Sequence, residues 1–216
     1  MKKFCTIYLF LLQILTLHAQ SYSLLSPNQK INLTVTLKDK IYYSVSCNNT
    51  PLIQKSYLQL SLENKVLGEN PKLIKPATSV INETSMPVVP MKNKIVENKC
   101  NVLKLSFKNN YAVEFRAYDD GIAYRFITIK SKEVIVKNED VHLQFADNYS
   151  AWLSPTTSFR TAYEILYKYK SVNALSKDTM STLPVLVNAN DKYKILISEA
   201  DLFDYPHIFL KSSGNN

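Results

Sequence analysis

The stretch Leu103-Lys-Leu-Ser-Phe-Lys-Asn-Asn-Tyr-Ala-Val-Glu-Phe-Arg-Ala-Tyr-Asp-Asp-Gly-Ile-Ala-Tyr-Arg-Phe126 sets the fold class of this chain. Apolar and polar side chains alternate through it in three runs, which is the pattern of strands with one buried face. Asn109-Asn110 separates the first two runs, and Asn tolerates the positive φ of a tight turn. Asp119-Asp120-Gly121 separates the last two, and we expect Gly121 to take the left-handed conformation. The sequence therefore predicts a three-stranded antiparallel meander.

The same alternation predicts further strands on both sides of this meander. They span residues 31–37, 41–45, 141–145, 183–187 and 193–197. Residues 64–100 are rich in Asn, Lys and Pro, so we expect mostly loop there, with short strands within it. Residues 161–170 fit either one short helix or an irregular strand. Because no helix of core length, βαβ alternation or internal repeat is evident, the predicted class is all-β, an antiparallel β-sandwich.

The N-terminus has the composition of a secretory signal peptide. A short positive start is followed by an apolar run over residues 4–17 and by the small residue Ala19. We expect cleavage after Ala19, which makes 1–19 the signal peptide and 20–216 a secreted or periplasmic domain. The apolar run is shorter than a membrane span of about 20 residues. No later segment is apolar enough to cross a membrane once the signal is removed.

Charge and cysteine content narrow the classes of function. The formal net charge is +8, but the lysines are scattered and form no Arg-rich cluster. We therefore expect a solvated surface and no nucleic-acid partner. Cys47 and Cys100 follow the signal peptide. They either form a disulfide, which an exported protein can hold, or stay apart, because spacing alone does not show proximity. Neither has the spacing of a zinc site.

The main candidate for function is the carboxylate of Glu199. It follows the alternating run 193–197, and Asp201 and Asp204 come soon after it. A carboxylate fixed at the end of a rigid strand is well placed to hold a cation or meet a polar ligand. We expect Asp201 and Asp204 to shape the loop by accepting backbone N–H bonds, with a second calcium-ligand role as the less favoured alternative. Tyr205-Pro206 is expected to rigidify the same loop.

Other charged residues are assigned structural roles. Asp119 and Asp120 are explained by their turn rather than by paired-carboxylate catalysis. Arg116 and Arg125 lie on the polar faces of their strands and are expected to pair at the surface, with Glu114 or with each other's neighbours.

Histidine and tryptophan carry weaker signals. His142 and His207 have no Ser or Cys partner that the sequence identifies, so triad chemistry is unsupported. Trp152 either stacks on a sugar ring or serves as a packing residue.

Four segments resemble the N-terminal domain of glycoside hydrolase family 97. Phe115-Arg-Ala-Tyr-Asp-Asp-Gly-Ile-Ala-Tyr-Arg-Phe126 is similar to the central hairpin of that domain. Ser198-Glu-Ala-Asp-Leu-Phe-Asp-Tyr-Pro206 is similar to its Glu-Ser/Ala-Asp-Leu-x-Asp-Tyr-Pro segment. Leu24-Leu-Ser-Pro-Asn28 resembles the opening strand, and Trp152-Leu-Ser-Pro155 lies at a matching place. The first two motifs together are specific, and the resemblance covers essentially the whole of the chain beyond the signal peptide.

This resemblance implies a fold, a metal and a larger protein. Family members are exported α-glycosidases that act on α-glucosides or α-galactosides. Their N-terminal domain is a β-sandwich of the galactose-mutarotase-like type, which packs against a (β/α)8 barrel. The resemblance implies an active-site calcium ion with one ligand from the Glu-x-Asp-Leu segment, which is Glu199 here. The other ligands and the catalytic residues lie in the barrel, so this chain is expected to be an incomplete, C-terminally truncated sandwich that is inactive alone.

The sequence and the resemblance leave three possible functions for this chain. The favoured one is the N-terminal portion of an exported, calcium-dependent α-glycosidase, which braces the barrel and meets an α-linked oligosaccharide or polysaccharide in the complete enzyme. The alternative is a stand-alone secreted carbohydrate-binding β-sandwich module without catalysis, and a third is a secreted structural or assembly domain without a small ligand. Glycoside hydrolysis needs a proton donor and a nucleophile or base across the bond. The sequence identifies no such pair, so no catalytic residue is predicted in this chain.

Overall fold

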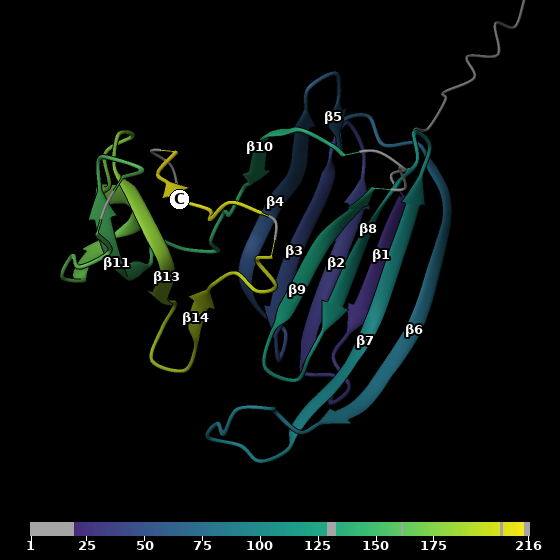
Figure 1. Ribbon diagram of the computed structural model, residues 1–216, viewed down its shortest axis with the longest axis horizontal. Helices are drawn as coiled ribbons and strands as arrows, with labels where there is room; N and C mark the ends of the chain where they lie inside the picture. Colours follow the sequence, from purple (N-terminus) through teal and green to yellow (C-terminus); the bar gives the residue numbers. More distant parts are fainter. Residues whose placement is uncertain (1–19, 129–132, 161, 204, 214–216) are drawn as a thin grey trace, which may run out of the picture.

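The computed structural model describes residues 20–128, 133–160, 162–203 and 205–213. They form three antiparallel sheets, of which two face each other as a sandwich and the third lies beside it (Figure 1). The predicted signal peptide, residues 1–19, lies outside the described residues. Within those that are described, no helix is long and apolar enough to cross a membrane.

The three sheets use almost all of the regular structure. Sheet 1 has the spatial order β1 (Gln20–Leu25), β2 (Ile31–Leu37), β3 (Ile41–Cys47), β4 (Thr50–Leu62) and β10 (Val136–Val141), with β5 (Val66–Leu67) also paired to β4. Sheet 2 has the order β6 (Leu73–Ser85), β7 (Val96–Phe107), β8 (Tyr111–Ala117) and β9 (Ile122–Thr128). Sheet 3 has the order β12 (Lys168–Ser171), β11 (Ser150–Thr156), β13 (Met180–Asn188) and β14 (Lys194–Ile197), with β15 (Leu210–Lys211) also paired to β13. A short 3-10 helix, η1 (Val172–Ala174), follows β12. The prediction of an all-β antiparallel sandwich is confirmed.

The predicted meander is confirmed as β7, β8 and β9. In its register Leu103 lies opposite Phe115, and Phe115 lies opposite Tyr124. Asn109 and Asn110 both have positive φ, 71° and 58°, as the turn between β7 and β8 requires. Local turn chemistry and hydrophobic alternation therefore agree in this part of the chain.

The turn at Asp119-Asp120-Gly121 forms, but the expected conformation of Gly121 is wrong. The N–H of Tyr118 donates to the carbonyl oxygen of Gly121 at 2.8 Å, so four residues link the last pair of β8 and β9. Hairpin loops of this length are most often built on a type I turn, whose central residues keep negative φ. Gly68 is the described glycine that does take positive φ, 87°.

The expectation of mostly loop over residues 64–100 is also wrong. β6 and β7 pair along their whole length in a long hairpin, and only residues 86–95 form its connecting loop. β6 is the edge strand of sheet 2, where Pro76 is tolerated because one side of its backbone needs no ladder bond. Most side chains of β6 are exposed on both faces, so the strand lacks the alternation that sequence analysis depends on.

The sequence left two questions open: whether residues 161–170 form a helix or a strand, and whether Cys47 and Cys100 form a disulfide. The segment within 162–170 contains no helix, and its last residues join β12 as a short strand. Cys47 and Cys100 are both free thiols, Cys47 half-buried at the end of β3 and Cys100 buried in β7. The strand expected over 141–145 begins earlier, as β10, and ends at Val141.

The main core lies between sheets 1 and 2. Its fully buried side chains come from the inward rows of both sheets: Leu33, Val35, Ile41, Leu58, Leu103, Leu105, Val113 and Phe115. Burying one such side chain stabilises the fold by roughly 1.5–3 kcal/mol. This packing fixes the positions of the strand ends around the sandwich.

A second, smaller core lies under sheet 3. Leu153, Val185 and Val187 from that sheet pack with Leu52 of β4 and with Phe145. Sheet 3 is thus attached to the edge of sheet 1 by apolar contacts. Figure 1 shows it to the left of the sandwich, with the C-terminal segment between them.

We predict that truncating the main core is costly and that truncating an exposed leucine is not. Leu105 is 0% exposed and Leu166 is 85% exposed. Leu105→Ala should lower the free energy of unfolding by about 2–5 kcal/mol, because it leaves a cavity between the two sheets. Leu166→Ala, the matched control, should change it by less than about 0.5 kcal/mol in urea unfolding. Equal losses for the two variants would contradict the assigned core.

Candidate functional site

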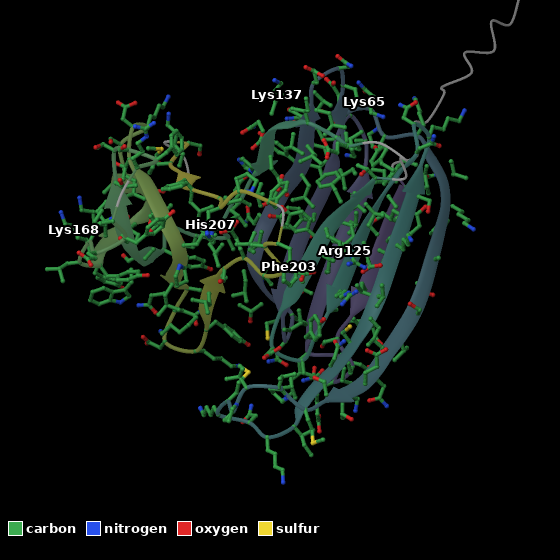
Figure 2. The ribbon with its side chains drawn as sticks, in the orientation of Figure 1. Lys65, Arg125, Lys137, Lys168, Phe203 and His207 are labelled. Carbon is green, nitrogen blue, oxygen red and sulfur yellow. The ribbon has the colours of Figure 1, made fainter. Side chains whose placement is uncertain are left out.

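Glu199 lies just beyond the end of β14, as the sequence predicts. β14 ends at Ile197 after pairing with β13, and the chain reaches β15 only at Leu210. We call residues 199–208 the Glu199 segment; within it Asp204 lies outside the described residues. Figure 2 shows its labelled residues Phe203 and His207 between sheet 3 and the sandwich. A side chain on this segment is therefore positioned by tertiary contacts rather than by a sheet ladder.

The carboxylate of Glu199 is held by the other end of its own segment. Its Oε1 accepts a hydrogen bond of 2.8 Å from the backbone N–H of Ile208. Its Oε2 lies 3.4 Å from Nδ1 of His207. The Glu199 side chain is 10% exposed, whereas that of His207 is 66% exposed. The segment thus closes into a loop that carries one sheltered carboxylate.

A second carboxylate, that of Glu139, connects the Glu199 segment to the sandwich. Glu139 lies on β10, and its Oε2 accepts a hydrogen bond of 2.7 Å from the hydroxyl of Tyr205. Its Oε1 accepts one of 2.5 Å from the hydroxyl of Tyr124, on β9. The ring of Tyr205 also packs against the main core. The prediction that Tyr205 rigidifies the loop agrees with these contacts.

The two tyrosine hydroxyls stay protonated around neutral pH. Burial raises the pKa of Tyr124, and the nearby charge of Glu139 raises it further. Burial also raises the pKa of Tyr205, followed by its hydrogen bond to Glu139 and by the charges of Glu139 and Glu199. Both phenols therefore act as donors to Glu139.

Sequence reasoning did not find Glu139 or Tyr124. Tyr124 lies within the hairpin motif 115–126 but was read there only as a strand residue, and Glu139 belongs to no motif. The two come together with Tyr205 because β9, β10 and the Glu199 segment converge in the fold. No local pattern could have identified this group.

Of the two acids that follow Glu199, the structure describes Asp201 but not Asp204. Asp201 is exposed and has a φ of 63°, a conformation that Asp tolerates in turns. Asp201 lies in irregular backbone beyond β14, and its predicted acceptance of backbone N–H bonds stays a prediction, while Asp204 lies outside the described residues.

Two other carboxylates have structural partners. Asp119 Oδ1 accepts a hydrogen bond of 2.8 Å from the N–H of Asn28 and so connects two turns. Glu114 is buried, and its Oε1 lies 2.9 Å from guanidinium nitrogens of both Arg116 and Arg125. The predicted pairing is confirmed, but the carboxylate lies below the surface and is shared by two cations. These contacts account for both acids without catalysis.

His142 stacks on a neighbouring aromatic ring, and among the described residues it is not part of a catalytic triad. Its ring stacks on Tyr57 with 4.6 Å between centroids and 8° between planes. Burial lowers the pKa of His142, so the ring is neutral around pH 7. His207, the other described histidine beyond the signal peptide, faces Glu199 as stated above.

Trp152 lies on the outer face of sheet 3. Its ring centroid is 4.9 Å from that of Tyr169 on the neighbouring strand, and the two side chains are 46% and 47% exposed. The register continues this outer row through Leu186 and Leu196. The side chain is therefore a surface residue and does not fill either core.

The described residues do not build a complete metal site. Among them, no group of three or more His, Cys, Asp or Glu side chains could hold a metal ion. Calcium takes six to eight oxygen ligands as a rule. The Glu199 carboxylate fits such an ion as one hard oxygen ligand, held in place by the Ile208 N–H. The remaining ligands would have to come from elsewhere.

This chain matches a known protein family and is similar to a known glycosidase. The family described as Glycosyl-hydrolase 97 N-terminal matches residues 24–216. The retaining alpha-galactosidase of Bacteroides thetaiotaomicron is 33% identical over 224 residues, which cover 99% of this chain and 34% of that protein. This chain thus spans about a third of the length of that relative.

Solved structures share the fold. A Glycoside Hydrolase Family 97 enzyme from Pseudoalteromonas sp., in complex with acarbose, has a TM-score of 0.77 at 22% identity, over 88% of this chain and 30% of that one. A beta-arabinopyranosidase has a TM-score of 0.76 at 23% identity, over 85% of this chain and 32% of that one. At these identities the similarity concerns the fold alone.

Proposed function

This chain belongs to the Glycosyl-hydrolase 97 N-terminal family, and we propose that it serves an exported, calcium-dependent α-glycosidase of the α-galactosidase or α-glucosidase type. In that enzyme it braces the catalytic barrel and supplies Glu199 as one calcium ligand. The single observation that carries the proposal is the sheltered Glu199 carboxylate, fixed at a strand end by the N–H of Ile208. The similarity to a retaining alpha-galactosidase supports the class of substrate, an α-linked oligosaccharide or polysaccharide.

The residues around Glu199 support docking of a further domain. Phe159, Phe203 and Tyr163 expose much of their rings, and Tyr163 lies 6.4 Å from the His207 ring, centroid to centroid. Phe159 contacts Phe209 edge to face at 5.2 Å. Exposed apolar groups of this kind mark interaction surfaces. The aromatic side chains would exclude water around Glu199 once they are covered.

The role of this chain is to orient, and bond cleavage is assigned to the rest of the enzyme. A bound calcium ion would act as a Lewis acid toward substrate oxygen. Glu199 would offer a carboxylate oxygen whose direction is set by its bond to Ile208. Retaining glycosidases use two carboxyl groups about 5 Å apart. The sequence identifies no acid and nucleophile pair here, so both are assigned to the barrel.

Export rests on the sequence of residues 1–19. Their positive start, apolar run and small residue Ala19 fit cleavage at that point. The proposed location is the periplasm or the exterior.

Calcium titration of the full-length protein tests the role of Glu199. Glu199→Gln should weaken calcium binding by about tenfold or more, because an amide replaces a charged ligand of nearly the same shape. Asp201→Asn is the matched control, since it removes an exposed charge two residues away and should leave the affinity within about twofold. Isothermal titration calorimetry measures both. If Glu199→Gln binds calcium as the parent does, the proposed ligand is wrong.

A second candidate function, carbohydrate binding without catalysis, is favoured by the Trp152 and Tyr169 pair. Aromatic faces with polar neighbours are suited to sugar rings. The amide of Asn188 donates to the Tyr169 hydroxyl at 2.9 Å, and Lys194 contacts the same asparagine. A polar rim therefore lies beside the two rings.

Fluorescence tests this second function, because Trp152 is the single tryptophan of the chain. Titration with an α-linked oligosaccharide should change its emission, and Tyr169→Ala should weaken the apparent affinity by about tenfold. Phe203→Ala removes an exposed ring that lies outside the strands of sheet 3, 87% exposed against 47% for Tyr169, and serves as the control. An unchanged emission at saturating sugar rules out binding at this pair.

A further inference from the structure

We propose that Glu139 is a positioning residue, which uses hydrogen bonds from Tyr124 and Tyr205 to hold the Glu199 segment on the sandwich. We call these three residues the phenol clamp. The inference rests on the proposed role of Glu199, and it assigns a function to a residue outside the family's sequence motifs quoted above.

The Glu199 segment needs an external anchor. The bond between Glu199 and Ile208 fixes the two ends of the segment to each other. It does not fix them to the sandwich, because both residues belong to the same loop. On the far side β15 is only two residues long and pairs with the beginning of β13. A carboxylate that must meet a ligand from another domain requires a better defined position than these contacts provide.

The phenol clamp provides a bond from the middle of the segment to both sheets. Glu139 belongs to sheet 1 and Tyr124 to sheet 2, while Tyr205 comes from the segment itself. Each oxygen of the one carboxylate accepts one phenol, at 2.5 Å and 2.7 Å. Short O–H···O⁻ bonds to a charged acceptor are about twice as strong as neutral ones. The segment is thereby tied to the two sheets that enclose the main core.

The apolar part of Tyr205 strengthens the same connection. Its ring packs against the main core beside Tyr124, which also contacts that core. Tyr124 in turn packs edge to face on Phe126, with 6.3 Å between centroids. Packing therefore holds both rings in addition to the hydrogen bonds that their hydroxyls donate to Glu139. Replacing a tyrosine by phenylalanine keeps this packing and removes only the hydrogen bond.

Two matched variants separate positioning from general stability. Tyr205→Phe and Tyr124→Phe each remove one donor from the same carboxylate, but only Tyr205 lies on the Glu199 segment. The measurement is hydrogen exchange of the Ile208 amide in the full-length protein without calcium. Tyr205→Phe should raise that exchange rate by about tenfold to a hundredfold, as expected for the loss of a hydrogen bond to a charged group. Tyr124→Phe should raise it less than threefold, because Glu139 keeps its bond to Tyr205.

Calcium affinity gives the second readout. Tyr205→Phe should weaken calcium binding by about tenfold, whereas Tyr124→Phe should leave the calcium affinity nearly unchanged. Both variants should lower the unfolding temperature by similar amounts, because each removes one hydrogen bond to the same carboxylate. Glu139→Gln, which retains one acceptor oxygen, should fall between the parent and Tyr205→Phe in exchange. Unchanged Ile208 exchange in both Tyr205→Phe and Glu139→Gln would overturn the clamp. If instead exchange rises but Glu199→Gln does not affect calcium, the clamp stands and the metal role of Glu199 fails.

Discussion

The burial of alternate side chains between sheets 1 and 2 is the constraint on which the rest of this structure depends. Phe115 and Leu105 on one sheet and Leu33 and Ile41 on the other are almost wholly removed from water. A slip of one residue in any of these strands would move its apolar row to the solvent side. The register is therefore fixed, and with it the place where each outward polar side chain emerges. Glu139 and Tyr124 lie instead on the inward rows, opposite Leu60 and Phe115, and they meet because the registers of β10 and β9 are fixed in the same way.

The charged groups are distributed according to the same packing. Glu114 lies on the outer side of β8, and two arginines offset the cost of burying its charge. Among the described residues Glu139 forms no ion pair, and its two oxygens accept hydrogen bonds from two phenol hydroxyls. Glu199 accepts one backbone bond and keeps acceptor capacity. Of these three carboxylates, Glu199 is the one without an arginine or a tyrosine hydroxyl as a partner among the described residues, and His207 faces its Oε2 at 3.4 Å.

The sequence predicted those parts of the fold in which local pattern and tertiary burial agree. The meander around Phe115 has alternating faces and an Asn-Asn turn, and the structure confirms its three strands, although not the conformation expected of Gly121. β6 was missed because an edge strand exposed on both faces carries no alternation. Glu199 could be placed at a strand end from the run that precedes it, and its proposed metal role came from a family resemblance. Glu139 could not be found, since its bonds join residues 15 and 66 positions apart along the chain.

The most direct measurement is a crystal structure of the full-length protein with calcium, with the ion identified by its anomalous scattering. The account predicts a carboxylate oxygen of Glu199 within about 2.3–2.6 Å of the ion, with the Tyr205 hydroxyl still bonded to Glu139. A calcium ion coordinated without Glu199, or a Glu199 carboxylate paired to a lysine or arginine in place of the ion, would contradict it.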